Sequence, residues 1–186
     1  MLSGGGIHGV VLRSLSPIGD ERGVLCETHR DTWYGNPRPQ QWDFVTTNAH
    51  FLRGLHVHRL RFDYLTIVQG RAAVGLADLR RNSTTFRKTM LIDVDGNSPQ
   101  EILIPPGVVH GIMAITAVSY LYGLTSYWDG NDQLGCRYDD PSLNLPWPGT
   151  APQLNRHDLN LPDFETLIQQ FEAAGGVGAG LQTMGI

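Results

Sequence analysis

One stretch, FLRGLHVHRLRFDYLTIVQG at residues 51–70, limits the possible folds more than any other part of the chain. His56 and His58 are two residues apart, so in an extended strand both side chains project from the same face. Asp63 follows, and Tyr64–Val68 is a continuous apolar run, typical of a strand that is buried on both faces. Two imidazoles and a carboxylate that converge on one face are a candidate metal-ligand or acid–base set.

A second motif supplies a third histidine. Residues 104–111 (IPPGVVHG) form a Pro/Gly turn that delivers His110 next to a strand. Along the chain the pattern is H-x-H, four residues, an acid, six residues and a glycine, followed later by P-x-G-x-x-H. These two motifs resemble the signature of the cupin superfamily, whose members are small double-stranded β-barrels.

Short apolar runs separated by turn residues fill most of the remaining chain, and 22 Gly and 11 Pro residues suit such an arrangement. Residues 16–23 (SPIGDERG) are predicted to be a turn. The apolar and β-branched patterns predict strands at 9–15, 24–28, 43–48, 52–56, 64–68, 72–79, 89–94, 101–104, 112–115 and 119–127.

One helix is predicted, over Asp163–Ala174. Asp163 is a candidate N-cap, and Gly175–Gly176 ends the helical pattern. Its apolar residues recur at helical spacing: Phe164, Leu167, Ile168 and Phe171. The expected fold class is therefore all-β, a double-stranded β-helix (cupin jelly-roll barrel) with a short C-terminal helix. Residues 1–160 would form the barrel domain, and residues 161–186 the helix and a loose tail of the same domain.

Composition and charge exclude several classes of protein. With 14 basic and 18 acidic residues the net charge is −4, and the absence of a basic run argues against a nucleic-acid partner. Cys26 and Cys136 are too few for a disulfide framework. The N-terminus lacks a signal-peptide pattern, and the most apolar region, 102–124, is interrupted by prolines and His110. We expect a cytoplasmic protein that has no membrane span.

Several blocks, in order, resemble the nucleotide-sugar 3,5-epimerase family, whose members include dTDP-4-dehydrorhamnose 3,5-epimerase. The blocks are GDERG at 19–23, LRGLH at 52–56, ADLRRNSTTF at 77–86, IPPGVVHG at 104–111, LYGLTSYW at 121–128, RYDDPSLNLPWP at 137–148 and LNRHD at 154–158. The resemblance implies a cupin-like barrel that forms a homodimer. It also implies action on a dTDP-4-keto-6-deoxyhexose without an organic cofactor.

The resemblance also implies roles for individual residues. A carbon next to a ketone is acidic, so epimerisation requires a base on one face and an acid that returns a proton from the other. His56 matches the base, Asp158 the carboxylate that orients it, and Tyr122 the acid. The substrate-binding positions are matched by Arg22, Glu27, Asn48, Arg53, His110 and Trp128.

Asp63 departs from the family, which has a lysine at this position to stabilise the developing enolate oxygen. An unpaired carboxylate would repel an enolate. With Asp63, the cupin-type ligand set would be His56, His58, Asp63 and His110, which suits one divalent Fe, Mn, Ni or Zn ion. His56 cannot be a ligand and a free base at the same time. A metal-dependent cupin (isomerase, lyase or oxygenase) and a non-catalytic nucleotide-sugar binding protein therefore remain alternatives.

Overall fold

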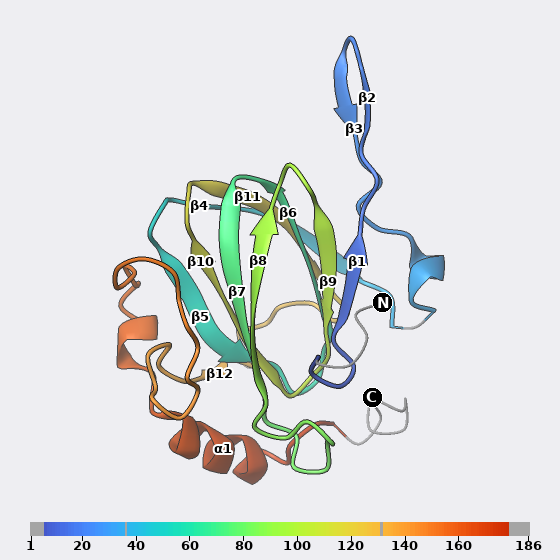
Figure 1. Cartoon of the computed structure of the whole chain (residues 1–186). Coiled ribbons are helices and arrows are strands. Elements are labelled where there is room, and N and C mark those ends of the chain that lie inside the picture. Colours follow the sequence, from blue (N-terminus) through green and yellow to red (C-terminus); the bar gives the residue numbers. More distant parts are fainter. Residues whose placement is uncertain (1–5, 36, 131, 179–186) are drawn as a thin grey trace.

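Two five-stranded antiparallel sheets face each other in a computed structural model that describes residues 6–35, 37–130 and 132–178 (Figure 1). The first sheet has the order β1 (Val11–Ser14), β9 (Gln100–Ile104), β6 (Asp63–Gln69), β11 (Val118–Leu124) and β4 (Gln41–Thr47). The second has the order β12 (Leu134–Gly135), β5 (Leu52–Val57), β10 (Val108–Ala114), β7 (Arg71–Asp78) and β8 (Thr89–Asp95). The expected fold class, an all-β jelly-roll barrel with one short C-terminal helix, is confirmed.

The main apolar core lies between the two sheets. Leu65 and Ile67 of β6 meet Val74 and Leu76 of β7 and Ile112 of β10, and all five are almost completely buried. Each such aliphatic side chain contributes about 1.5–3 kcal/mol on burial. The continuous apolar run that predicted a doubly buried strand corresponds to β6, of which residues 63–67 are buried.

The predicted helix is α1 (Phe164–Ala173), which begins one residue later and ends one residue earlier than expected. Asp163 caps it, because its carboxylate accepts a hydrogen bond from the Thr166 backbone N–H at 2.7 Å. The four apolar residues of the helix pack against Leu55 and Val57 of β5, together with Val109 of β10. Residues 179–186 of the expected tail lie outside the described residues.

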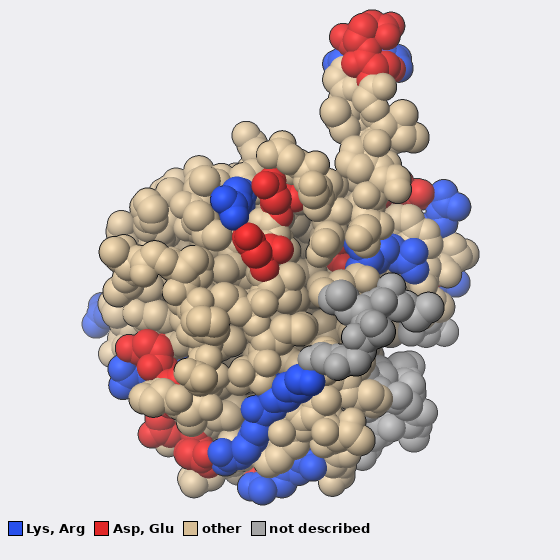
Figure 2. Space-filling view, in the orientation of Figure 1, with Lys and Arg blue, Asp and Glu red and all other residues tan. Residues whose placement is uncertain are grey.

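Residues 16–23, predicted to be a turn, contain the first strand and the turn of a β-hairpin, and its second strand begins one residue before the strand predicted at 24–28. Strands β2 (Ile18–Asp20) and β3 (Gly23–Leu25) pair with each other and project from the barrel (Figure 1). Charged side chains cover the tip of the hairpin, and its shaft is uncharged (Figure 2). The shaft carries exposed apolar side chains, among them Ile18 and Val24 at 68% and 73% exposure. No helix within the described residues has the length and apolarity of a membrane span.

Candidate active site

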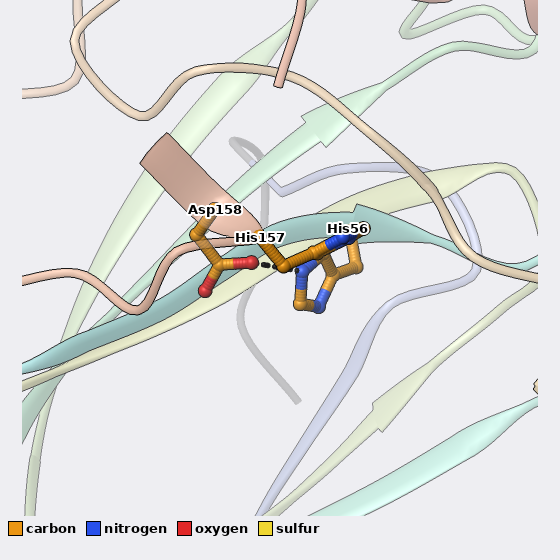
Figure 3. Close-up of side chains that lie close together, drawn as sticks. All are labelled: His56, His157 and Asp158. Carbon is orange, nitrogen blue, oxygen red and sulfur yellow. Dashed lines mark hydrogen bonds and ion pairs between the residues drawn. The ribbon is translucent and has the colours of Figure 1, made fainter. Parts of the chain in front are cut away.

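The strongest feature of the site is a histidine–carboxylate pair. His56 lies on β5, and Asp158 begins the short 3-10 helix Asp158–Asn160, 102 residues later. His56 Nε2 lies 2.8 Å from Asp158 Oδ1, and Figure 3 shows the two side chains pointing toward each other. The Asp158 side chain is 1% exposed and that of His56 is 30% exposed. An ionised carboxylate only accepts hydrogen bonds, so Nε2 carries the hydrogen and Nδ1 is left as the basic nitrogen.

Asp158 is held in its charged form. Burial alone would raise the pKa of this carboxyl group, but hydrogen bonds from the His56 ring and the Gly54 backbone N–H outweigh burial and lower the pKa. The two carboxylate oxygens have separate partners, since Gly54 N–H donates to Oδ2 at 3.1 Å. Asp158 therefore orients the His56 ring.

Gly54 sets the position of His56 relative to the neighbouring strand. Its φ angle is +117°, and a Cβ atom there would lie 2.8 Å from Gly111 Cα and 2.8 Å from the His110 carbonyl oxygen. Only glycine allows strands β5 and β10 to approach so closely. In the ladder between these strands, His110 is the partner of His56, so two candidate residues become neighbours.

The candidate acid lies on the facing sheet. Tyr122 of β11 has its hydroxyl 2.9 Å from His110 Nε2. His110 Nδ1 lies 3.2 Å from the Val108 carbonyl oxygen, so Nδ1 donates and Nε2 accepts from Tyr122. Burial and the nearby Asp63 charge raise the pKa of Tyr122 well above its ordinary value, and burial lowers the pKa of His110 to about 4. Tyr122 is therefore protonated and His110 neutral at pH 7.

The four-residue metal set expected from the sequence is not assembled. Ligand atoms of His58, Asp63 and His110 lie within 4.8 Å of one another, whereas His56 groups with His157 and Asp158. His56 Nε2 is hydrogen-bonded to Asp158, and the histidines that lie close to Asp63 are His58 and His110. Asp63 Oδ2 is 3.7 Å from His58 Nε2 and 3.5 Å from His110 Nε2.

Sequence reasoning missed Arg61, which enters this group. Its side chain is 5% exposed, its Nε donates to Asp63 Oδ1 at 3.2 Å, and its NH2 donates to His58 Nε2 at 2.9 Å. A divalent ion bound by His58 and Asp63 would need acceptor atoms that Arg61 already uses, so ion and guanidinium do not fit together. The available sequence signal was that Arg61 stands two positions before Asp63.

His157 was also missed. It is an exposed residue whose ring centroid lies 5.9 Å from that of His56, beside the His56–Asp158 pair (Figure 3). The available sequence signal was that His157 directly precedes Asp158 in the LNRHD block, which places it near any partner of Asp158.

Two of the expected nucleotide-binding residues share a cavity. Asn48 and Arg53 line a volume of about 280 Å³, and Arg53 Nε donates to Thr47 Oγ1 at 2.9 Å. The cavity is also lined by Thr46, Phe51, Leu52 and Asn155. Trp128 is 55% exposed, and its backbone N–H donates to the Gln41 side chain at 3.0 Å.

Arg22 and Glu27 are not brought to this cavity within one chain. Arg22 pairs with Asp20 on the projecting hairpin, and Glu27 pairs with Arg30. A larger cavity of about 620 Å³ lies elsewhere, between the 79–84 loop and the end of α1. Its described lining residues include none of the candidate residues, so the larger of these two cavities is not the one that the candidate residues line.

Comparisons with known proteins agree with this arrangement. Residues 5–166 match the family model described as dTDP-4-dehydrorhamnose 3,5-epimerase. The protein of that name from Mycobacterium tuberculosis H37Rv is 32% identical over 134 residues, 68% of this chain and 66% of the relative. The one from Escherichia coli K12 is 26% identical over 173 residues, 88% of this chain and 94% of the relative.

A solved structure has the same fold. NovW, a 4-keto-6-deoxy sugar epimerase from the novobiocin biosynthetic gene cluster of Streptomyces spheroides, superposes with a TM-score of 0.83 at 24% identity, over 95% of this chain and 92% of that chain. Because the family model spans most of the sequence, the chain belongs to the dTDP-4-dehydrorhamnose 3,5-epimerase family.

Proposed function

We propose that this chain inverts a carbon next to the 4-keto group of a dTDP-4-keto-6-deoxyhexose. The observation that carries the proposal is the His56–Asp158 pair at 2.8 Å, in which the carboxylate is buried and the imidazole is partly exposed. It is joined across the barrel to Tyr122 through His110, which is the strand partner of His56 and the hydrogen-bond partner of the tyrosine. In this proposal the base and the acid come from facing sheets, since His56 lies on β5 and Tyr122 on β11.

The chemistry follows from these positions. His56 Nδ1 removes the proton from the carbon next to the ketone, and the electron pair of the C–H bond moves into the enolate. Asp158 stabilises the imidazolium that forms. Tyr122 then gives its hydroxyl proton to the opposite face of the carbon, which inverts the centre. An acid and a base in such positions each accelerate proton transfer by about 10²–10⁴-fold.

Hydrogen exchange tests this reaction. Incubation with dTDP-4-keto-6-deoxyglucose in D2O should introduce deuterium at C3 or C5, as followed by NMR and mass spectrometry. His56→Ala should slow the exchange by about 10²–10⁴-fold. A wild-type protein that binds dTDP yet exchanges nothing would instead be a nucleotide-sugar binding protein without this activity.

The nucleotide is proposed to occupy the cavity lined by Asn48 and Arg53, with its base against Trp128. The forked donors of arginine suit phosphate oxygens, and a charge-assisted hydrogen bond contributes about 1.5–3 kcal/mol. Arg53→Ala should therefore weaken dTDP binding about tenfold or more in calorimetry. Arg137→Ala is the matched control, because Arg137 is an exposed arginine paired with Asp139. Equal affinities for all three proteins would remove the cavity from the proposal.

We also propose a homodimer. The exposed apolar side chains of the hairpin, together with Phe44 on the edge strand β4 at 67% exposure, support a surface that a second copy covers. In such a dimer Arg22 and Glu27 would reach the nucleotide of the partner. Val24→Glu should give a monomer in light scattering, while Glu21→Gln at the hairpin tip should remain dimeric. A monomeric wild type contradicts this.

A metal-assisted reaction is the competing possibility for this site. His58, Asp63 and His110 form a two-imidazole, one-carboxylate group that suits divalent Fe, Mn, Ni or Zn once Arg61 has moved away. Such an ion would supply positive charge to an enolate. Elemental analysis of protein purified without an affinity tag decides this, and about one equivalent of metal per chain would favour the ion.

A further inference from the structure

Four ionisable side chains, almost completely buried, lie next to the candidate acid. His58, Arg61, Asp63 and His110 are between 1% and 6% exposed, and His110 is hydrogen-bonded to Tyr122. Buried charges are retained in proteins only when they are paired and hydrogen-bonded. The hydrogen bonds among these four side chains therefore indicate which positive charge balances which negative charge.

Both imidazoles are neutral, and each presents Nε2 as a hydrogen-bond acceptor to the other buried side chains. His58 Nδ1 lies 2.7 Å from the carbonyl oxygen of Asp132, and His110 Nδ1 lies 3.2 Å from that of Val108. A carbonyl oxygen accepts only, so each Nδ1 donates and each Nε2 offers a lone pair. Neither ring then supplies positive charge opposite Asp63.

Arg61 is the cation of this group. Its Nε donates to Asp63 Oδ1 and its NH2 donates to His58 Nε2, so one guanidinium neutralises the carboxylate and fixes the neighbouring ring. Tyr122 has one hydroxyl hydrogen and two acceptors close by, His110 Nε2 and the Asp63 carboxylate. Asp63 Oδ2 lies 3.5 Å and the Tyr122 hydroxyl 2.9 Å from the same atom, His110 Nε2, so the carboxylate and the hydroxyl are neighbours.

We propose that Arg61 is a positioning residue for proton return: its guanidinium compensates Asp63, so that Tyr122 can give its proton to the substrate carbon. The inference rests on the proposed epimerisation. In this step the O–H bond of Tyr122 breaks, a C–H bond forms at the enolate carbon, and the O–H electron pair remains on a phenolate. That phenolate forms beside Asp63. Without Arg61 it would face an uncompensated carboxylate, which disfavours the step. Water later restores the hydroxyl proton.

Two rates measured together in D2O test the role of Arg61. The first is deuterium uptake into recovered, uninverted dTDP-4-keto-6-deoxyglucose, which reports proton removal by His56. The second is formation of the epimer, which also requires proton return. Arg61→Met should keep the first rate within about threefold and lower the second by about tenfold or more, within the range of a lost acid.

A double variant separates charge compensation from simple loss of structure. Arg61→Met with Asp63→Asn removes both charges, so the inversion rate should recover to within about threefold of that of Asp63→Asn alone. Arg59→Met is the matched control: Arg59 lies two residues earlier, its Nε donates to the Gly176 carbonyl oxygen, and both rates should stay at the wild-type level.

Three results would overturn the inference. If Arg61→Met lowers both rates equally and Asp63→Asn restores neither, Arg61 is only structural or acts on proton removal. One equivalent of metal that is lost in Asp63→Asn would make the ion, and not Arg61, the compensating charge. A wild type that neither exchanges nor inverts refutes the proposed function itself, and the role of Arg61 with it.

Discussion

Asp158→Asn tests the central pair of the site with little change of shape. The amide is nearly isosteric with the carboxylate and can still accept the Gly54 N–H hydrogen bond that Asp158 Oδ2 receives at 3.1 Å. Two things are lost: the negative charge 2.8 Å from His56 Nε2, and the acceptor for its hydrogen, because the amide NH2 that replaces Oδ1 can only donate and so favours the tautomer with the hydrogen on Nδ1. The variant therefore tests the support of the base, through charge and tautomer together, with little effect on the fold.

The expected magnitude follows from that contact. A hydrogen bond to a charged group contributes about 1.5–3 kcal/mol, and each 1.36 kcal/mol changes a rate tenfold, so loss of this bond alone should slow deuterium uptake by about 10-fold to 150-fold. The change of tautomer adds to that loss. The assay is the initial rate of deuterium incorporation from D2O into dTDP-4-keto-6-deoxyglucose, at saturating substrate. Asp139→Asn is the control, because Asp139 is a surface aspartate paired with Arg137.

The outcome for stability should differ between two substitutions. Asp158→Asn should unfold close to the wild-type temperature, while Asp158→Ala leaves the buried Gly54 N–H without its acceptor and loses about 1–3 kcal/mol. An Asp158→Asn protein that is folded and exchanges deuterium within twofold of the wild-type rate would refute the assignment of His56 as a base supported by Asp158.

Three further predictions concern the scaffold. Gly54→Ala should lower Tm by at least about 4 °C, because an L-residue at φ +117° and a 2.8 Å contact with β10 together cost about 2 kcal/mol or more of stability. Gly149→Ala is the control for the backbone conformation alone, since Gly149 has φ +75° and no atom within 4 Å of the added Cβ. Equal losses of stability in the two variants would contradict the contact argument. Asp163→Ala should destabilise the protein to urea by about 1 kcal/mol through loss of the helix cap, with Asp163→Asn as the conservative control and an unchanged midpoint as the contrary result. Asp78→Asn should make stability depend less on pH in the acid range. Hydrogen bonds from Arg80, Ser83 and Thr85 outweigh burial and lower the pKa of Asp78 in the folded protein. The stability that Asp78 contributes is therefore present above the unfolded pKa of about 3.9 and is lost as pH falls through the lower folded pKa. A difference in Tm between wild type and Asp78→Asn that stays constant from pH 7 to pH 3 would show that Asp78 contributes no charge-dependent stability.

Local sequence signals predicted the elements better than the contacts between them. The strand at Tyr64–Val68 was predicted from a continuous apolar run, and α1 from its 3.6-residue spacing, because both patterns reflect burial of a nearby surface. Of the β2–β3 hairpin, the second strand was predicted in part, at 24–28, whereas β2 was missed because it has only three residues and buries no face, so it lacks a periodic pattern.

The site residues show the same division. The His56–Asp158 contact joins positions 102 apart, and no local pattern contains it; only the resemblance to a family suggested it. The residues of the predicted four-ligand set fall into two separate groups for a similar reason. Spacing brought Asp63 and the histidines into one region, but it could not show that Asp158 bonds His56 or that Arg61 turns inward to Asp63.

The position of Asp158 late in the chain has a consequence for how activity arises during synthesis. Strands β1 to β12 are complete by Gly135, but the carboxylate that orients the His56 ring is incorporated 23 residues later, after the long loop and just before α1. A truncated chain that ends in that loop would contain every strand and the base, and would still lack the group that activates it. Such a chain would also lack the α1 side chains that pack against Leu55 and Val57 of β5, so the last part of the chain to be made completes both the core and the proposed catalytic pair.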